Sequence, residues 1–521
     1  MGDSPVDFPG QNATDFWGLR PLLIRDLTRS TVLPCADYGV SSFLPLSANT
    51  FKPLDRLNKS VARCVTGAFR TAALAALEKE AAMLPAQLRI ERDAMNTVAY
   101  YLFLPSSHPI RPLLRNAIAV APKSPKNASI LHYVERIPGT RWPPSVPTRG
   151  QRLRKRKVPR TVGAEESPAM DFDETLGMEP IVPVYAAPWA TPLPVTTIIL
   201  PKEDALRALE VAMGDERRRD ATWFTDGSLL EGCAGGAAVR VEGGVEKECI
   251  EVPLGDGQVC EGEMEGLFCA TTKALRDKCH CVLCVADSQA ALRGILSTKP
   301  RSGQFRAIRY DQLIRNAMLT TPHLTILNLW TPAHIGTDGN ELADAAAKAA
   351  TKCDPNPDNY VSLTSVCRHI HVSSLAEWDT RWKTVKTGKA LRYLDRTPPS
   401  LIPSPLYSSS SLSRKASSWI SQLRTGFTYL NADRYKSGFV DSPSCEACGA
   451  LYETRAHYLL ECPVWEPHRQ PLHAACRDIG HFGPLHLSPL LTHPKLLTPV
   501  GKFIDATELF ARPRPPPDST L

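Results

Sequence analysis

The sequence contains no long apolar run, and this absence excludes a membrane-spanning helix. No stretch of the 521 residues approaches the roughly 18 consecutive apolar residues that such a helix needs. The first ten residues, MGDSPVDFPG, lack the basic and apolar segments of a secretion signal. We therefore expect an intracellular protein that makes no membrane contact. The sequence does not decide between nucleus and cytoplasm.

We also do not expect a framework of disulfide bonds. The 15 cysteines are odd in number, and intracellular thiols remain reduced. Cys445, Cys448, His457 and Cys462 instead have the spacing C-x2-C-x8-H-x4-C. A Cys-x-x-Cys turn binds one metal, and a histidine and a further cysteine complete a tetrahedron around Zn²⁺. Unless the four cluster by chance, they predict a zinc knuckle at 441–470 that folds only around its metal and contacts nucleic acid or the rest of the chain.

The chain also lacks a large charge of either sign. Its net charge is +7, from 61 Lys and Arg against 54 Asp and Glu. The distribution is uneven, because residues 221–350 carry 12 basic and 16 acidic residues and the remainder is therefore basic. An acidic centre within a basic chain suits a cation site flanked by a surface for polyanions. Ordinary variation of surface charge is the alternative.

The 46 prolines indicate long connecting segments between folded parts. Residues 1–135 include helical periodicity, as in LDRLNKSVARCVTGAF, and predict a mostly helical segment. Residues 136–200 predict a Pro-rich linker. Its basic block at 149–160 has seven Arg or Lys and no acid, which suits phosphate contact, a nuclear address or a solvated tether. Residues 353–440 predict a helical, Ser-rich connector, and 471–521 a Pro-rich tail.

Residues 218–352 have the pattern of a mixed α/β domain. TWFTDGS, GGAAVRVEG and EKECIEVPL predict three successive antiparallel strands with glycine-containing turns. The amphipathic helix EGEMEGLFCATTKALRD follows, then the buried strand HCVLCVADS, further helices, the strand LTILNLWTPAH and a final helix, GNELADAAAKAA. This order predicts a five-stranded mixed sheet, an antiparallel meander plus parallel strands, with helices on its faces.

Four acids stand near strand ends or in helices of this predicted domain. Asp226 closes the first strand at the entry to an Asp-Gly turn, and Asp287 closes the buried strand. Glu263 is in the first turn of the first helix, and Asp344 is in the last helix. Converging carboxylates must be neutralised, and oxygen-only ligation favours Mg²⁺ or Mn²⁺. Each acid alone is more often a turn, cap or surface residue, but four at equivalent positions predict a site for two cations, which suits phosphodiester hydrolysis.

The motifs TDGS, EGEMEG, VADSQAAL and WTPAHIGTDGNELADAAAKAA resemble the successive motifs of the type 1 ribonuclease H family. The resemblance implies that Asp226, Glu263, Asp287 and Asp344 are the metal ligands. Glu265 is the competing acid in GEMEG, but the family spacing favours Glu263. His334 has the position of a mobile histidine that assists proton transfer and product release, and its Gly-rich loop fits such a role.

The same resemblance implies an RNA/DNA hybrid as the substrate, recognised by its shape, its phosphates and the RNA 2′-OH. Thr225, Gly227 and Ser228 flank the first acid, where the backbone can approach the RNA strand. A basic run before the last strand predicts phosphate contacts, with a solvated helix face as the alternative. The run consists of Lys299, Arg301, Arg306, Arg309 and Arg315.

The flanking segments resemble the C-terminal part of a non-LTR retrotransposon reverse transcriptase polyprotein. Residues 31–135 are similar to the segment after the polymerase palm, with TGAFRT as its mark, and the predicted knuckle follows the ribonuclease H motifs. The polymerase motif Y/F-A-D-D is absent from the sequence, so we expect no reverse transcriptase activity. We expect a hybrid-cleaving endonuclease from the end of a retroelement reading frame; the alternative is a relic that binds nucleic acid and has lost catalysis.

Overall fold

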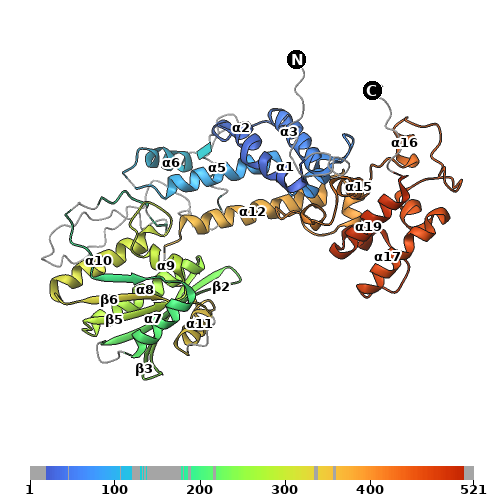
Figure 1. Ribbon diagram of the computed structural model, residues 1–521. Coiled ribbons are helices and arrows are strands. Elements are labelled where there is room, and N and C mark those ends of the chain that lie inside the picture. The colour runs from blue at the N-terminus through green and yellow to red at the C-terminus, as the bar shows by residue number, and fades with distance from the viewer. Residues whose placement is uncertain are drawn as a thin grey trace, which may run out of the picture. The chain divides into compact units, whose positions relative to one another are not determined.

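The computed structural model describes residues 19–44, 46–105, 107–119, 130–131, 133, 137, 178–179, 181–185, 189–214, 219–333, 338–355 and 360–509 (Figure 1). The basic block at 149–160 and His334 lie outside these residues. The chain divides into two compact units: one comprises Met1–Ala94 and Val372–Leu521, and the other comprises Met95–His371. No helix among the described residues is long and apolar enough to cross a membrane.

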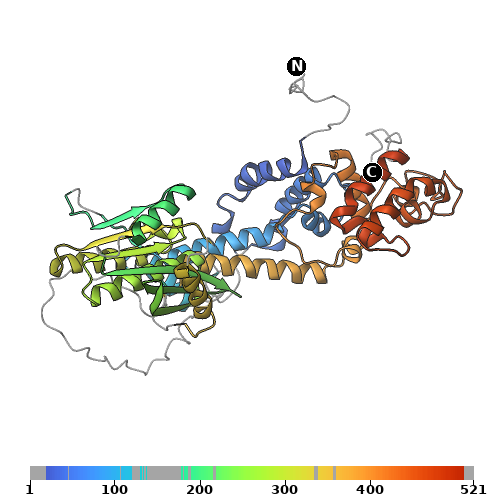
Figure 2. The same ribbon diagram turned by 60° about the horizontal axis from the view of Figure 1, so that its bottom comes forward.

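The second unit contains a mixed sheet of six strands in the order β1-β6-β5-β2-β3-β4. The strands are β1 (Val195–Ile198), β2 (Ala221–Leu230), β3 (Cys233–Glu242), β4 (Val245–Asp256), β5 (Cys281–Ala286) and β6 (Thr325–Trp330). The meander β2-β3-β4 is antiparallel, whereas β5 pairs in parallel with both β2 and β6. These strands lie side by side in both views (Figures 1 and 2).

The mixed sheet flanked by helices is confirmed, but it has one strand more than we expected. β1 pairs in parallel with β6, with Val195 opposite Ile326, and comes from the segment interpreted as linker. It has only four residues, VTTI, directly after a Pro-rich stretch, so its local pattern is too short to identify a strand. Its position depends on β6, whose free edge it covers.

Helices cover both faces of the sheet because adjacent residues of the central strands point to opposite sides. Trp223 of β2 packs with α8 (Val259–Arg276), α9 (Gln289–Gly294) and α10 (Gln304–Thr320). Its neighbour Phe224 packs on the other face with α7 (Lys202–Gly214) and α11 (Asp338–Ala350). β5 is buried on both faces, which explains its nearly continuous apolar sequence CVLCVA.

A short segment from the expected linker is also anchored in this unit. The Glu179 carboxylate, fully buried, accepts hydrogen bonds from the Gly303 and Leu363 amides at the starts of α10 and α12 (Leu363–Thr384). The Gln304 side chain donates to the Val182 carbonyl at 2.6 Å and accepts from the Val182 amide at 2.9 Å. Negative charge at two helix starts is favourable, so Glu179 and Val182 are structural parts of the second unit.

The first unit is helical. Its N-terminal helices are α1 (Pro21–Leu27), α2 (Leu33–Asp37), α3 (Ala48–Thr66) and α4 (Leu74–Glu80), and the C-terminal ones are α13 (Lys389–Leu394), α14 (Pro405–Ser408), α15 (Arg414–Thr425), α16 (Asn431–Lys436), α17 (Glu466–Asp478), α18 (Leu487–Thr492) and α19 (Pro494–Thr507). The C-terminal core includes Leu423, Tyr458, Leu491 and Ile504, all buried. Much of the segment we expected to be a Pro-rich tail is therefore packed helix. Pro494 begins α19, where its missing N–H costs nothing.

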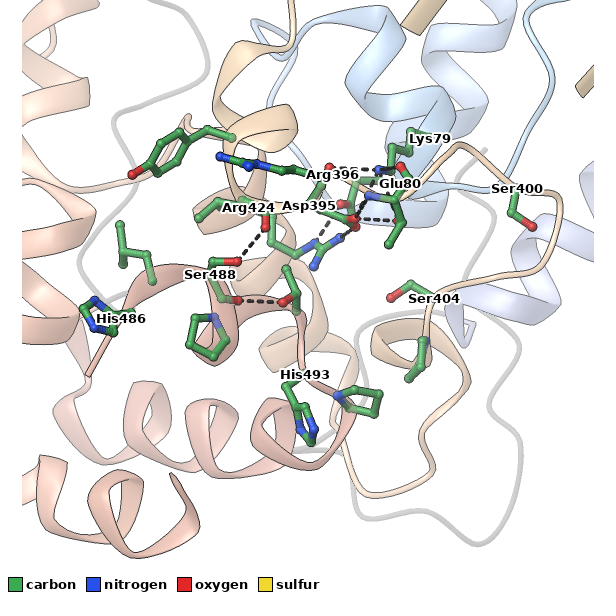
Figure 3. Close-up of a pocket in the computed structure, with 18 of the residues that line it drawn as sticks. Lys79, Glu80, Asp395, Arg396, Ser400, Ser404, Arg424, His486, Ser488 and His493 are labelled. Carbon is green, nitrogen blue, oxygen red and sulfur yellow. Dashed lines mark hydrogen bonds and ion pairs between the residues drawn. The ribbon is translucent and has the colours of Figure 1, made fainter. Parts of the chain in front are cut away.

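Buried ion pairs join the two ends of the chain within this unit (Figure 3). The Arg424 Nε lies 2.7 Å from a Glu80 carboxylate oxygen, and its Nη2 lies 2.9 Å from Asp395. Lys79 Nζ lies 3.2 Å from Asp395 as well. These four residues line a cleft of about 1000 Å³. Because each charge is paired, they serve to connect helices that are far apart in sequence.

Candidate active site

Asp226 lies inside β2, not at its end. Gly227 pairs with Gly236 across the hairpin, and the chain turns only at Glu231 and Gly232, which have φ values of 51° and 90°. The expected Asp-Gly turn was therefore wrong, because a later pair of residues adopts the positive φ that a two-residue hairpin turn requires. The Asp226 side chain is 7% exposed, and its Oδ1 accepts a hydrogen bond from the Gly227 amide at 2.8 Å.

Helix α8 places Glu263 beside Asp226 because glycines let the helix approach the hairpin closely. A Cβ at Gly227 would lie 2.4 Å from the Val259 carbonyl oxygen. A Cβ at Gly262 would lie 2.3 Å from the Gly235 carbonyl oxygen. Neither position accepts a larger residue without moving backbone. Gly227 and Gly262 thus determine how closely Glu263 approaches β2. Glu263 is 3% exposed.

Three of the four expected ligands converge. Asp226, Glu263 and Asp287 can each offer one carboxylate oxygen so that all three atoms lie within 4.8 Å of one another. Asp287 follows β5, and the Trp330 Nε1 donates a hydrogen bond to its carbonyl at 2.9 Å. Asp344 on α11 is not in this group; its Oδ2 accepts a hydrogen bond from Lys348 Nζ, one turn later, at 2.7 Å.

The electrostatics of the cluster suit a cation. Burial, together with the charge of Asp287, raises the pKa of Asp226 to about 7. Burial and the charges of Asp226 and Asp287 also raise the pKa of Glu263 well above its ordinary value. Within the described part of the chain, Glu263 Oε2 is buried and has no hydrogen-bond partner. Closely spaced oxygen donors with one unsatisfied atom fit Mg²⁺ or Mn²⁺, which would restore the charged form of each acid.

The expected substrate-contacting residues differ in accessibility. Thr225 is fully buried and its hydroxyl faces the Val285 carbonyl at 3.5 Å, whereas Gly227 and Ser228 are partly exposed. The surface beside Asp226 is therefore formed by Gly227 and Ser228 and not by Thr225.

The residues of the basic run also differ in accessibility. Arg306 is 2% exposed and forms an ion pair with Glu265 at 3.0 Å, so it does not reach a phosphate from this position. Arg309 is partly exposed and lies over the Phe268 ring at 4.1 Å. Lys299 and Arg301 are exposed, and Arg315 pairs with its helix neighbour Asp311. Arg306 and Arg309 are three residues apart on α10 and both face Glu265, but only Arg306 is fully covered.

The expected zinc ligands also converge. One ligand atom from each of Cys445, Cys448, His457 and Cys462 lies within 4.8 Å of all the others. The Cys445 and Cys462 sulfurs are 4.0 Å apart, and Cys448 Sγ is 3.3 Å from His457 Nε2. Sulfurs bound to one tetrahedral Zn²⁺ are separated by roughly 3.8 Å, given Zn–S bonds of about 2.3 Å. The four side chains therefore fit zinc.

Two residues near the carboxylates were not predicted. Lys348 pairs with Asp344, and the D-x-x-x-K spacing in a helix could have indicated this pair. Trp330 contacts Asp287 across neighbouring parallel strands, and no local pattern indicates that contact.

Comparisons with known proteins give one family match and several similar solved structures. Residues 218–352 match the RNase H family model. A search of the curated proteins found no match. Among solved structures, a foamy viral protease-reverse transcriptase in complex with dsDNA is 23% identical, over 26% of this chain and 95% of that chain, with a TM-score of 0.22. A longer prototype foamy virus protease-reverse transcriptase chain is matched over only 21% of its length.

Two ribonucleases H1 are also similar. The RNase H1 of the halophilic archaeon Halobacterium salinarum is 19% identical over 25% of this chain and 96% of that chain, with a TM-score of 0.21. LC11-RNase H1 in complex with an RNA/DNA hybrid is 17% identical over 25% of this chain and 99% of that chain, with a TM-score of 0.20. Residues 218–352 are thus a domain of the ribonuclease H family within a longer chain.

Proposed function

We propose that this protein hydrolyses the RNA strand of RNA/DNA hybrids with two divalent cations, Mg²⁺ or Mn²⁺. Asp226, Glu263, Asp287 and Asp344 would hold them. The observation that carries the proposal is the convergence of three carboxylates from β2, α8 and the end of β5 within a buried cluster of a ribonuclease H domain. Buried acids so close together are costly unless cations neutralise them.

The bound cations would supply a hydroxide near neutral pH and stabilise the leaving 3′ oxygen. The chain itself would position the hybrid and move protons. Gly227 and Ser228 are partly exposed next to Asp226 and offer backbone contacts to the RNA strand. Arg309, whose partly exposed guanidinium lies over the Phe268 ring, would contact a phosphate. His334, between β6 and α11 in the sequence, would transfer a proton and assist product release.

A catalytically lapsed, nucleic-acid-binding protein is the second candidate, and one observation favours it. Asp344 lies outside the group of three carboxylates and is neutralised by Lys348 instead. That pair is on the surface, with Lys348 58% exposed at its side chain, so it stabilises the helix only weakly. A cation that needs Asp344 can therefore displace Lys348 at small cost, and we give precedence to the active enzyme.

The test is cleavage of a fluorescent RNA/DNA hybrid across a range of Mg²⁺ and Mn²⁺ concentrations. The full chain should cut only the RNA strand, Asp226→Asn should not cut, and His334→Ala should turn over more slowly with unchanged metal binding. DNA and RNA duplexes of the same sequence serve as substrate controls. Absence of cleavage above the Asp226→Asn background at every metal concentration would leave the lapsed candidate. Cleavage of a pure duplex would instead show a different nuclease specificity.

For the rest of the chain, we propose retroelement origin and zinc binding. The support is the order of segments: a helical region, a ribonuclease H domain, then a Cys and His cluster. The cluster is part of the helical core, since Tyr458 and Leu459, next to His457, are fully buried in it. Zinc would therefore stabilise this core, in addition to any contact with nucleic acid by the knuckle or the basic linker.

A further inference from the structure

Helix α8 carries three glutamates at alternate positions, Glu261, Glu263 and Glu265. Residues two apart on an α-helix are separated by roughly 200°, so the outer two share one face and the middle one points the opposite way. The structure agrees with this geometry. Glu263 faces Asp226 and Asp287, while Glu261 and Glu265 face α10. All three are buried, with exposures of 5% or less.

Arg306 of α10 neutralises the two outer glutamates. Its Nε lies 3.0 Å from a Glu265 oxygen and its Nη1 lies 3.8 Å from a Glu261 oxygen. The Arg306 side chain is only 2% exposed. Arg309 adds a second contact to Glu265 at 3.2 Å, and Glu261 also accepts a hydrogen bond from the Gln258 amide that begins the helix. The start of α8 thus faces a buried arginine at ion-pair distance on its rear side, although among the described residues Arg306 Nε and Nη1 have no hydrogen-bond partner.

We propose that Arg306 is a positioning residue for the divalent-cation site. It fixes the first two turns of α8, which place Glu263 against β2. This inference rests on the proposed function of the Asp226, Glu263 and Asp287 cluster. Arg306 does not contact the cluster itself, and it acts through the helix that carries one of its members.

Two physical arguments connect the clamp to cation binding. First, a metal ligand must be held within about 0.5 Å of its working position, and Glu263 is attached to a helix whose rear contacts are ionic. Second, two buried carboxylates are costly to keep buried when the arginine between them is removed. If the arginine is removed, Glu261 loses its ion pair and Glu265 keeps only the partly exposed Arg309, so α8 must move outward to hydrate the two carboxylates fully. Glu263 would move with the helix, because it is part of the same first two turns of α8 that Arg306 contacts.

The experiment measures Mn²⁺ binding to the full chain by calorimetry, alongside hybrid cleavage. Arg306→Met should weaken Mn²⁺ binding by about tenfold or more, the range seen when a residue behind a metal ligand is removed. Arg306→Lys, which keeps the charge, should recover part of this loss. The KM for the hybrid should remain unchanged while kcat at limiting Mg²⁺ falls. Arg240→Met is the matched control, since Arg240 also pairs with two carboxylates, Glu242 at the end of β3 and Asp277 at the C-terminal end of α8, the end away from Glu263.

If Arg306→Met does not fold, the variant Glu261→Gln/Glu265→Gln/Arg306→Met replaces it, because this set leaves no unpaired buried charge. Tenfold weaker Mn²⁺ binding in the folded triple variant supports the proposal. The variant loses one net negative charge, and at physiological salt the loss of one charge outside the cation site weakens Mn²⁺ binding by less than this. Wild-type Mn²⁺ affinity in any folded variant that lacks Arg306 overturns it. A wild-type chain that binds Mn²⁺ but cuts no hybrid refutes the proposed function alone, and one that binds no Mn²⁺ refutes both.

Discussion

Replacing Asp226 with asparagine should make the metal-free protein progressively more stable than wild type as the pH rises. Burial raises the pKa of Asp226 to about 7 from an ordinary value of 3.8. An acid with a raised pKa binds its proton more tightly in the folded state than in the unfolded state. Folding is therefore favoured below the ordinary pKa, and this contribution is lost as the pH rises to the folded pKa. Asparagine has a similar shape and carries no charge, so it does not incur this loss.

The size of the effect follows from the shift in pKa. Between pH 3.8 and pH 7 the wild type should lose roughly 4 kcal/mol of stability relative to Asp226→Asn, at about 1.36 kcal/mol for each pKa unit. Glu263 does not cancel this effect, because burial and the charges of Asp226 and Asp287 shift its pKa in the same upward direction. Saturating Mg²⁺ should reverse the order, because a cation stabilises only the ionised wild type.

Hydrogen exchange of the amides of β2 and β5 is the suitable assay, because it reports on this sheet without a contribution from the helical unit. Exchange rates, corrected for the intrinsic effect of pH, give the free energy of opening for each protein from pH 4 to pH 8 in EDTA. A difference between wild type and Asp226→Asn that does not change over this range would refute the reasoning. So would an equal effect of Mg²⁺ on the two proteins.

Three further predictions concern the framework of the molecule. Gly262→Ala should destabilise the sheet unit by about 1–3 kcal/mol and reduce Mn²⁺ binding, because its Cβ would meet the backbone of β3. The control Gly214→Ala, which has open space around it, should do neither. Equal melting temperatures of the two variants would contradict this prediction. A fragment 178–371 should melt at a higher temperature than 218–371, because only the longer one keeps Glu179 and β1, and equal melting would show that both are dispensable. The full chain should contain about one zinc ion, and Cys448→Ser should lose it and lower the melting temperature of the helical unit; a metal-free wild type with an unchanged fold would exclude the site.

Local patterns in the sequence were sufficient for much of the sheet and for the two clusters of candidate ligands. Alternation and apolar runs predicted β2 to β6, because a half-buried or fully buried strand imposes its own period on side-chain polarity. The spacing of Cys445 and Cys448 predicted a metal-binding turn because both ligands lie within one short loop. Glu263 could be preferred over Glu265 from the motif, and the structure places the two on opposite faces of α8.

The features that escaped prediction depend on residues that are distant in the chain. β1 is a strand because β6 offers an edge 127 or more residues later, and Glu179 is buried because two helix starts meet there. The hairpin turn is at Glu231 and not at Asp226, because β2 continues to pair with β3 beyond Asp226 as far as Leu230, opposite Cys233.

The sequence by itself therefore determined which acids, thiols and imidazoles are available and at what spacing, and it indicated most of the strands and helices of the sheet unit, since local periodicity depends on neighbours within a few residues. Only the tertiary structure decided which of them meet. It brought Asp226, Glu263 and Asp287 together, left Asp344 beside Lys348, and turned Arg306 from an expected phosphate contact into a buried clamp. The physical reason is that burial and ion pairing depend on the whole packing of α8 and α10 against the sheet, which no short stretch of sequence specifies.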